Sequence, residues 1–255
     1  MNDLSHWEAR RSLLVQGLAD VQPDLVALQE VSLVNDNAAW LAGQLGFDHL
    51  YLSPKRGPDS HKEGIAILSR LPIEAQDTLD LLGQGRVAQC IQVTDSAQTV
   101  FFANGHLFWQ PGNSQARLQQ VERLLAWLDE FRGDHPVMIC GDFNGTPDTQ
   151  AIQKMYQRYR SAYVHIHGTE PVYTCPTPLT RSLLSQLRTL RSYFVYLRPQ
   201  HINPFWRGTL DYIFVDPSIQ VSDCQIILNK PAPNHPNLYP SDHFGLYANL
   251  KTGVL

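Results

Sequence analysis

Short apolar runs recur along the chain and alternate with polar connections. Each run has the length and the content of β-branched and aromatic residues that are typical of a buried strand. These runs are residues 24–30, 64–69, 87–93, 99–107, 137–143, 209–215 and 244–250. The pattern therefore predicts strands distributed over the whole chain.

Apolar residues at helical spacing mark a smaller number of helices. Residues 7–20 carry such a stripe behind a capping box that begins at Ser5. Residues 114–131 carry a second stripe. A third helix is expected to begin at Thr146, with Pro147 at its first position, where proline leaves no hydrogen bond unmade.

Many strands with few helices indicate a layered α/β (α+β) domain, with two β-sheets and helices on the outside. The chain has 255 residues, of which 43% are hydrophobic. A chain of this length buries enough surface to fold without a structural metal or disulfides. We expect residues 1–255 to form one domain.

Charge and cysteine usage exclude several classes of protein. The formal net charge of −4 excludes a protein that binds nucleic acid through an overall basic field. No two cysteines stand in C-x-x-C spacing, which excludes a zinc ribbon and a redox dithiol. The sequence begins without an apolar signal segment and has no run of about 20 apolar residues, so we expect a cytoplasmic protein without a membrane span.

One segment differs from the rest of the chain in its charge. Residues 171–210 contain five arginines and no acidic residue, interleaved with aromatic residues. Arginine between aromatics is typical of surfaces that bind phosphate together with bases or lipids. We treat residues 171–208 as an insertion and Arg188 and Arg191 as candidate substrate-binding residues. The alternative is an amphipathic insertion whose arginines are merely solvated.

Polar side chains with the chemistry of metal and phosphate sites stand at or near the ends of several apolar runs. They are Glu30, His106, Asp142, Asn144, Asp242 and His243, and Asp211 lies inside the run 209–215. Core packing gives no reason for so many polar run ends, and a charge within a buried strand requires a partner. Carboxylates with an amide oxygen and no thiolate suit Mg²⁺ or Mn²⁺ better than Zn²⁺.

Six short motifs occur in an order and spacing that resemble a known family. They are LQEV at 28–31, GIAILS at 64–69, NGHL at 104–107, CGDFN at 140–144, LDYIF at 210–214 and PSDHFGL at 240–246. Together they resemble the endonuclease/exonuclease/phosphatase superfamily along nearly the whole chain. This resemblance implies a DNase-I-like four-layer sandwich of two mixed β-sheets flanked by helices. LDYIF and PSDHFGL look closer to the deadenylase and sphingomyelinase branches than to abasic-site endonucleases.

The resemblance also implies roles for the acidic residues and for His243. Glu30 would be the principal Mg²⁺ ligand, and Asp242 would complete the metal environment. His243 would be the general base or an essential proton carrier, with Asp211 holding its ring in the productive tautomer. Sequence alone leaves the division of acid and base roles open, because interacting groups titrate together.

Three further residues would handle the water and the phosphate. Asp142 would orient or deprotonate the attacking water. Asn144 would donate a hydrogen bond to a non-bridging oxygen, and His106 would stabilise charge there or protonate the leaving group. The resemblance implies a Mg²⁺-dependent hydrolase of phosphodiester or phosphomonoester bonds, acting on nucleic acid, phospholipid or a small phosphodiester. The alternative is a phosphate-binding module of the same fold without turnover, and we infer no obligate protein partner in either case.

The sequence departs from the family at its beginning. Family members have a core strand that ends in a metal-binding asparagine shortly before the first helix, whereas this sequence begins at the helix cap. We therefore expect either that translation starts upstream or that the sheet lacks one strand and the metal one ligand. In either case the given chain should bind Mg²⁺ weakly and be less stable than an extended one.

Overall fold

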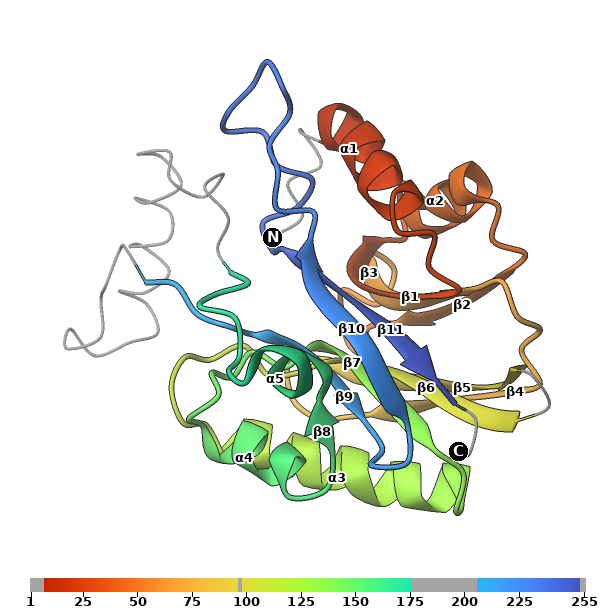
Figure 1. Ribbon diagram of the computed structural model, residues 1–255, viewed down its shortest axis with the longest axis vertical. Helices are drawn as coiled ribbons and strands as arrows, with labels where there is room; N and C mark the ends of the chain where they lie inside the picture. The colour runs from red at the N-terminus through yellow and green to blue at the C-terminus, as the bar shows by residue number, and fades with distance from the viewer. Residues whose placement is uncertain (1–6, 96–97, 176–205, 253–255) are drawn as a thin grey trace.

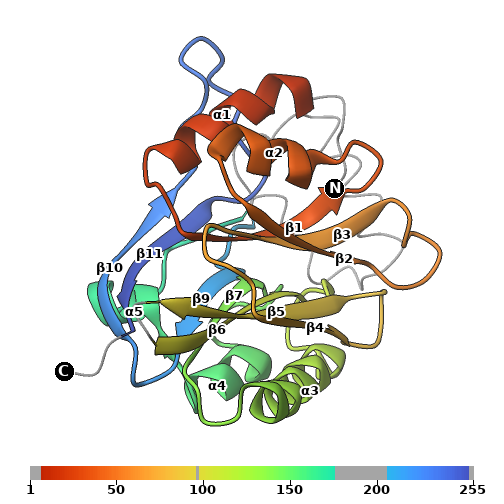
Figure 2. The same cartoon turned by 90° about the vertical axis from the view of Figure 1, so that its right-hand side faces the viewer.

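A computed structural model describes residues 7–95, 98–175 and 206–252. These residues form four layers, with helices outside and strands inside (Figure 2). The four-layer DNase-I-like sandwich predicted from the sequence is thus confirmed. Ser5 of the expected capping box lies outside the described residues, as do Arg188 and Arg191.

One inner layer is a continuous six-stranded mixed sheet. Its strand order is β4 (Ala75–Asp80), β5 (Val87–Asp95), β6 (Gln98–His106), β7 (Val137–Asp142), β9 (Asp211–Val215) and β8 (Arg160–Ser161). Strands β6 and β7 are parallel and are connected through helix α3 (Gln115–Arg132), while the other neighbours are antiparallel. The parallel pair brings the ends of β6 and β7 to the same edge of the sheet, with His106 paired to Asp142.

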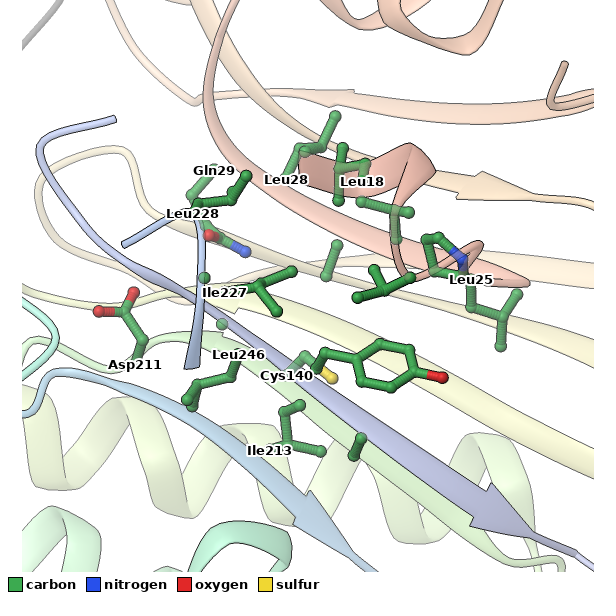
Figure 3. Close-up of a pocket in the computed structure, with 18 of the residues that line it drawn as sticks. Leu18, Leu25, Leu28, Gln29, Cys140, Asp211, Ile213, Ile227, Leu228 and Leu246 are labelled. Carbon is green, nitrogen blue, oxygen red and sulfur yellow. The ribbon is translucent and has the colours of Figure 1, made fainter. Parts of the chain in front are cut away.

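The other inner layer is split into two parts. Three strands pair in the order β1 (Leu25–Ser32), β3 (Glu63–Ser69) and β2 (His49–Pro54), and β10 (Gln220–Ile227) pairs with β11 (Gly245–Lys251). In the part of the chain that the structure describes, no ladder joins β1 to β11. Residues of both strands instead line a largely apolar cavity of about 530 Å³, shown in Figure 3. Among the described residues, this inner layer is therefore interrupted between β1 and β11.

Helices cover the outer face of each sheet layer (Figures 1 and 2). Helices α1 (Trp7–Ala19) and α2 (Asn37–Leu45) cover the split layer, and α3 (Gln115–Arg132) and α4 (Gln150–Tyr156) cover the six-stranded sheet. The short helix α5 (Ala162–His167) packs beside β9 and β10. Helix α3 begins as expected, because the Ser114 hydroxyl accepts a hydrogen bond from the Arg117 amide at 3.4 Å. None of the helices in residues 7–175 and 206–252 has the length and apolar character of a membrane span.

The apolar runs that predicted strands all contain strands, and residues 7–20 and 114–131 are helical within one or two residues of the expected ends. The predicted start of the third helix at Thr146 is wrong. Residues 146–149 form a turn in which the Thr149 amide donates to the Thr146 carbonyl at 3.0 Å, and α4 begins at Gln150. Strands β4 and β10 did not stand out in the sequence because both lie at sheet edges and carry many exposed polar residues.

Candidate active site

The polar residues at the strand ends meet at one end of the sandwich. Their ligand atoms form two groups, each with all atoms within 4.8 Å of one another: Glu30, Glu63 and His106, and Asp142, Asp211 and His243. His106 Nε2 lies 3.5 Å from Asp142 Oδ2, which connects the two groups. Residues far apart in the sequence thus converge on a single site that spans both sheets.

A β-bulge positions Glu30. The pairing of β1 with β3 is regular up to Leu28 and resumes one residue out of register at Val31. Glu30 has a φ of 54°, a left-handed conformation that is strained for a residue with a Cβ. Strain of this kind is found where the surrounding structure holds a functional side chain in place. The bulge turns Glu30 out of the regular alternation of the strand.

Asn104, from the NGHL motif, holds this bulge from the opposite sheet. Its side chain is fully buried and donates to the carbonyls of Leu28 and Ala66, at 3.0 Å each. Its Oδ1 accepts a hydrogen bond from Gln29 Nε2 at 2.7 Å. Asn104 therefore connects the two sheets directly beside Glu30, so we assign it a structural role.

Arg86 fixes the protonation of His106. Arg86 Nη1 lies 2.7 Å from His106 Nδ1, and both side chains are buried. Because a guanidinium only donates, His106 Nδ1 accepts, and the ring proton is on Nε2. Burial, together with the charge of Arg86, holds the pKa of His106 well below its ordinary value. His106 is thus a neutral hydrogen-bond donor that faces Asp142.

Close approach of two strands places Asp142 and Asn144 at the site. Gly141 has a φ of 145°, and a Cβ there would collide with the backbone carbonyl of Gly105 on the parallel neighbour. The Asn144 amide donates to Asp142 Oδ1 at 2.8 Å, and Asn144 Nδ2 lies 3.2 Å from Asp142 Oδ2. Burial raises the pKa of the Asp142 carboxyl to about 7, with a further contribution from the charge of Asp211. Asp142 is therefore able to exchange a proton near neutral pH.

Asp211 and His243 form a hydrogen-bonded pair. His243 Nδ1 lies 2.9 Å from Asp211 Oδ2, as the resemblance implied for these two residues. Burial alone lowers the pKa of His243, but the Asp211 carboxylate, together with Cys175, raises it well above its ordinary value. The Thr174 hydroxyl donates to the same Asp211 oxygen at 2.5 Å and fixes the carboxylate. His243 therefore carries a proton at neutral pH.

Three predicted site residues, Asp242, Arg188 and Arg191, do not belong to either group of potential metal ligands among the described residues. Asp242 lines the same cavity as Glu30 and His243, but it belongs to neither group of potential metal ligands, and Ser241 Oγ donates to its Oδ1 at 3.3 Å. Its role as a metal ligand stays a prediction. Arg188 and Arg191 cannot be placed relative to the site, because they lie outside the described residues.

Sequence reasoning missed three residues of the site. Glu63 directly precedes the apolar run 64–69, so it stands at a strand end like the residues that we did single out. Arg86 directly precedes the run 87–93 in the same way. Thr174 had no comparable signal, because its partner Asp211 is 37 residues further along the chain.

The donor set fits a hard divalent cation. Glu30 and Glu63 offer carboxylate oxygens close together at the edge of the cleft, and oxygen donors suit Mg²⁺ or Mn²⁺. His106 is the third member of that group, but its Nδ1 already accepts from Arg86 and its Nε2 carries a proton. The two glutamates are therefore the residues of this group that would hold the ion.

Comparisons with known proteins find relatives over most of the chain. A model of the endonuclease/exonuclease/phosphatase family matches residues 1–243. Nocturnin of Drosophila melanogaster is 26% identical over 286 residues, covering 96% of this chain and 42% of the relative. The 2',5'-phosphodiesterase 12 of Mus musculus is 29% identical over 214 residues, covering 75% of this chain and 32% of the relative. The chain thus spans less than half the length of these two relatives.

Solved structures show the same fold. An endonuclease/exonuclease/phosphatase from Bacteroides vulgatus has a TM-score of 0.75 at 19% identity and covers 99% of this chain and 94% of its own. The catalytic domain of human Nocturnin with a bound sulfate anion has a TM-score of 0.74 at 23% identity, covering 97% of this chain and 87% of its own. At these identities, the likeness concerns the fold alone.

Proposed function

The chain belongs to the endonuclease/exonuclease/phosphatase family, and we propose that it is a Mg²⁺-dependent hydrolase of phosphoric esters, chiefly phosphodiesters. The observation that carries this proposal is that the group around Glu30 and the group of Asp142 and His243 lie side by side, connected through His106. The names of the relatives, Nocturnin and 2',5'-phosphodiesterase 12, agree with it.

The protonation states of Asp142 and His243 give each residue one proton transfer: Asp142 accepts a proton and His243 donates one. Asp142, with a pKa of about 7, takes the proton of the attacking water as the bond from the water oxygen to phosphorus forms. His243, which is protonated because Asp211 raises its pKa, gives its proton to the leaving oxygen as the other phosphorus–oxygen bond breaks. The products are a phosphate monoester and an alcohol when the substrate is a diester.

Neutral donors stabilise the phosphoryl oxygens. His106 donates through Nε2, and its low pKa makes it a poor source of a transferable proton, so of its two expected roles charge stabilisation is the one we retain. Asn144 Nδ2 donates to Leu107 O at 3.1 Å and to Asp142 Oδ2 at 3.2 Å, and it would exchange one of these bonds to donate to a non-bridging oxygen. A Mg²⁺ or Mn²⁺ ion held by Glu30 and Glu63 would add positive charge at the same oxygens.

The test is the hydrolysis of bis-p-nitrophenyl phosphate by the wild type and by His243→Ala, each with Mg²⁺ and with EDTA. We expect turnover that requires the metal and falls by about 10²–10⁴-fold in the variant, as for loss of a general acid. Thermal melting of both proteins controls for folding. Turnover in EDTA, or an equally active variant, would contradict the proposal.

The interrupted sheet favours one alternative function. Glu30 and His243 also line the apolar cavity between β1 and β11, a space that no described strand fills. A module that binds a phosphate ligand without turnover would have the same residues. Tight binding of inorganic phosphate without hydrolysis of any ester, in a chain whose sheet is complete, would support this alternative.

A further inference from the structure

A second cavity adjoins the candidate active site on the side of Arg86. It has a volume of about 710 Å³, and Glu30, Glu63 and Arg86 form the wall that it shares with the site. Three loops form the remaining walls: residues 55–59, residues 80–85 and the segment that contains Trp109. We refer to this cavity as the flanking pocket. Because the two sites share this wall, one ligand could place a phosphate in the active site and a neighbouring group in the flanking pocket.

Hydrogen bonds between the loops set the shape of the flanking pocket. The Arg56 amide donates to the Gly85 carbonyl at 2.8 Å, and the Trp109 amide donates to Gln84 Oε1 at 3.1 Å. The buried Gln120 side chain accepts from the Phe108 amide and donates to the Leu82 carbonyl, both at 2.7 Å. The three loops are thus tied to one another and to helix α3.

The backbone of one loop is adapted to this arrangement. Leu82 and Gln84 have positive φ values of 59° and 54°, although neither is glycine. A Cβ at Gly85 would collide with the carbonyl of Arg56. Left-handed residues of this kind persist where surrounding contacts hold them, and they concentrate at binding sites. The pocket is therefore formed before any ligand arrives.

The pocket presents cations beside an exposed ring. Arg56 is exposed, and its guanidinium forms no ion pair with the residues that the structure describes, whereas Lys55 Nζ lies 3.8 Å from Glu63. The Trp109 side chain is 38% exposed and Leu82 is 59% exposed. A cation that tracks a phosphate, beside an aromatic face on which a base stacks, is the arrangement found in proteins that bind single-stranded nucleic acid.

The two acidic residues of the loops have other partners, and of the two in the shared wall, Glu63 lies 3.8 Å from Lys55 Nζ and 3.6 Å from Arg86 Nη1. Asp59 Oδ1 accepts from Lys62 Nζ at 3.1 Å, and Asp80 Oδ1 accepts from the Leu82 amide at 2.9 Å. They therefore repel an incoming phosphate less than bare carboxylates would. The exposed apolar residues are Trp109, Leu82 and Pro58, one on each loop, which suits a base or a sugar better than an acyl chain.

We propose that the flanking pocket binds the nucleoside phosphate next to the scissile bond, with the base or sugar against Trp109 and its phosphate on Arg56. The inference rests on the proposed function and deepens it, because it assigns the substrate to nucleotides that carry at least one further phosphate. A phospholipid substrate would leave both residues without a role.

Equilibrium binding in EDTA separates this inference from the proposed hydrolysis. The probes are fluorescein-labelled hexa-adenylates, one of RNA and one of DNA, followed by fluorescence anisotropy. Arg56→Ala and Trp109→Ala are compared with Lys251→Ala, which removes an exposed cation at the end of β11, away from the flanking pocket. Trp109→Phe keeps a ring and serves as the conservative variant.

For at least one probe we expect Trp109→Ala to weaken binding at least about fivefold, the lower end of stacking losses, and Trp109→Phe to restore most of it. Arg56→Ala should reduce the slope of log affinity against log salt by roughly 0.7, the value for one phosphate contact on a single strand. Lys251→Ala should change neither quantity.

Unchanged affinity and slope for both probes, or equal losses in the control, would overturn the inference. Failure of the wild type to hydrolyse any ester would instead contradict the proposed function and leave this binding result intact.

Discussion

Arg86 Nη1 and His106 Nδ1 are 2.7 Å apart in the interior of the protein, and this contact decides what His106 can do. Since arginine is always a donor, the imidazole accepts at Nδ1 and presents an N–H at Nε2. The same histidine with Nδ1 exposed to water could take up a proton. The buried arginine thus converts a titratable side chain into a fixed donor.

Replacing Arg86 by Met should therefore raise the pKa of His106, because the nearby positive charge is lost while burial still lowers the pKa. We also expect kcat to fall by about 10²-fold, similar to the loss of one preorganised donor, with KM less affected. Imidazole ¹⁵N shifts followed over a pH titration report both the tautomer and the pKa. An unchanged tautomer and pKa in Arg86→Met would show that Arg86 does not set them.

The Asp211–His243 pair predicts how stability depends on pH. The pKa of His243 is raised above 6.5 in the folded protein, so its contribution to stability is complete below 6.5 and is lost as the pH rises through the folded value. In Asp211→Asn the carboxylate is absent and burial lowers the pKa. The difference in free energy of unfolding between wild type and variant should therefore be largest below 6.5 and shrink at higher pH.

Urea unfolding across this pH range, with NMR titration of His243, tests the pair. If the variant loses the same free energy at every pH, Asp211 stabilises the fold without holding a proton on His243. A His243 pKa that does not fall in Asp211→Asn would contradict the assigned role of His243 as the proton donor.

Asn104 should be more important for stability than its place in a predicted active-site motif indicates. Asn104→Leu leaves the carbonyls of Leu28 and Ala66 without a donor, which costs about 1–3 kcal/mol for each buried group. We expect destabilisation in that range or above, measured by urea unfolding, together with weaker Mg²⁺ binding because Gln29 is released beside Glu30. The exposed Gln76→Leu on β4 is the matched control and should change stability by less than about 0.5 kcal/mol. A variant as stable as this control would refute the sheet-connecting role.

The cavity between β1 and β11 has room for a further strand, which should stabilise the protein. Two open sheet edges and the apolar side chains around them, including Leu18, Cys140 and Ile213, would be covered by one further extended segment (Figure 3). A chain extended ahead of helix α1 by an apolar strand should melt at a higher temperature and bind Mg²⁺ more tightly than the given chain. Equal melting temperatures and equal affinities would contradict this expectation.

The sequence predicted the site residues better than it predicted their contacts. Glu30, Asp142 and His243 could be singled out because each stands at or near the end of an apolar run, and strand ends meet at sheet edges. The bulge at Glu30 could not be found, since a one-residue register shift depends on pairing between distant segments. Thr174 could not be found for the same reason. Its role depends on one contact with Asp211, which is 37 residues further along the chain.

The edge strands β4 and β10 could not be recognised from the sequence either. Strands inside a layered fold are buried on both faces and read as apolar runs, whereas β4 and β10 have exposed polar faces that resemble loops. The turn at residues 146–149 likewise depends on a side-chain contact between Thr146 and Asp148, at 2.5 Å, that no periodicity reveals.

In the function that we propose, Glu30 anchors a divalent ion at a site that hydrolyses phosphoric esters. The most direct test is the rate of bis-p-nitrophenyl phosphate hydrolysis as Mg²⁺ is titrated into metal-free wild type and Glu30→Gln. We predict saturable activation of the wild type and a much higher Mg²⁺ requirement in the variant, since an amide is a poorer ligand than a carboxylate. Identical Mg²⁺ dependence of the two proteins, or full activity before any Mg²⁺ is added, would show that Glu30 does not hold an ion that hydrolysis requires.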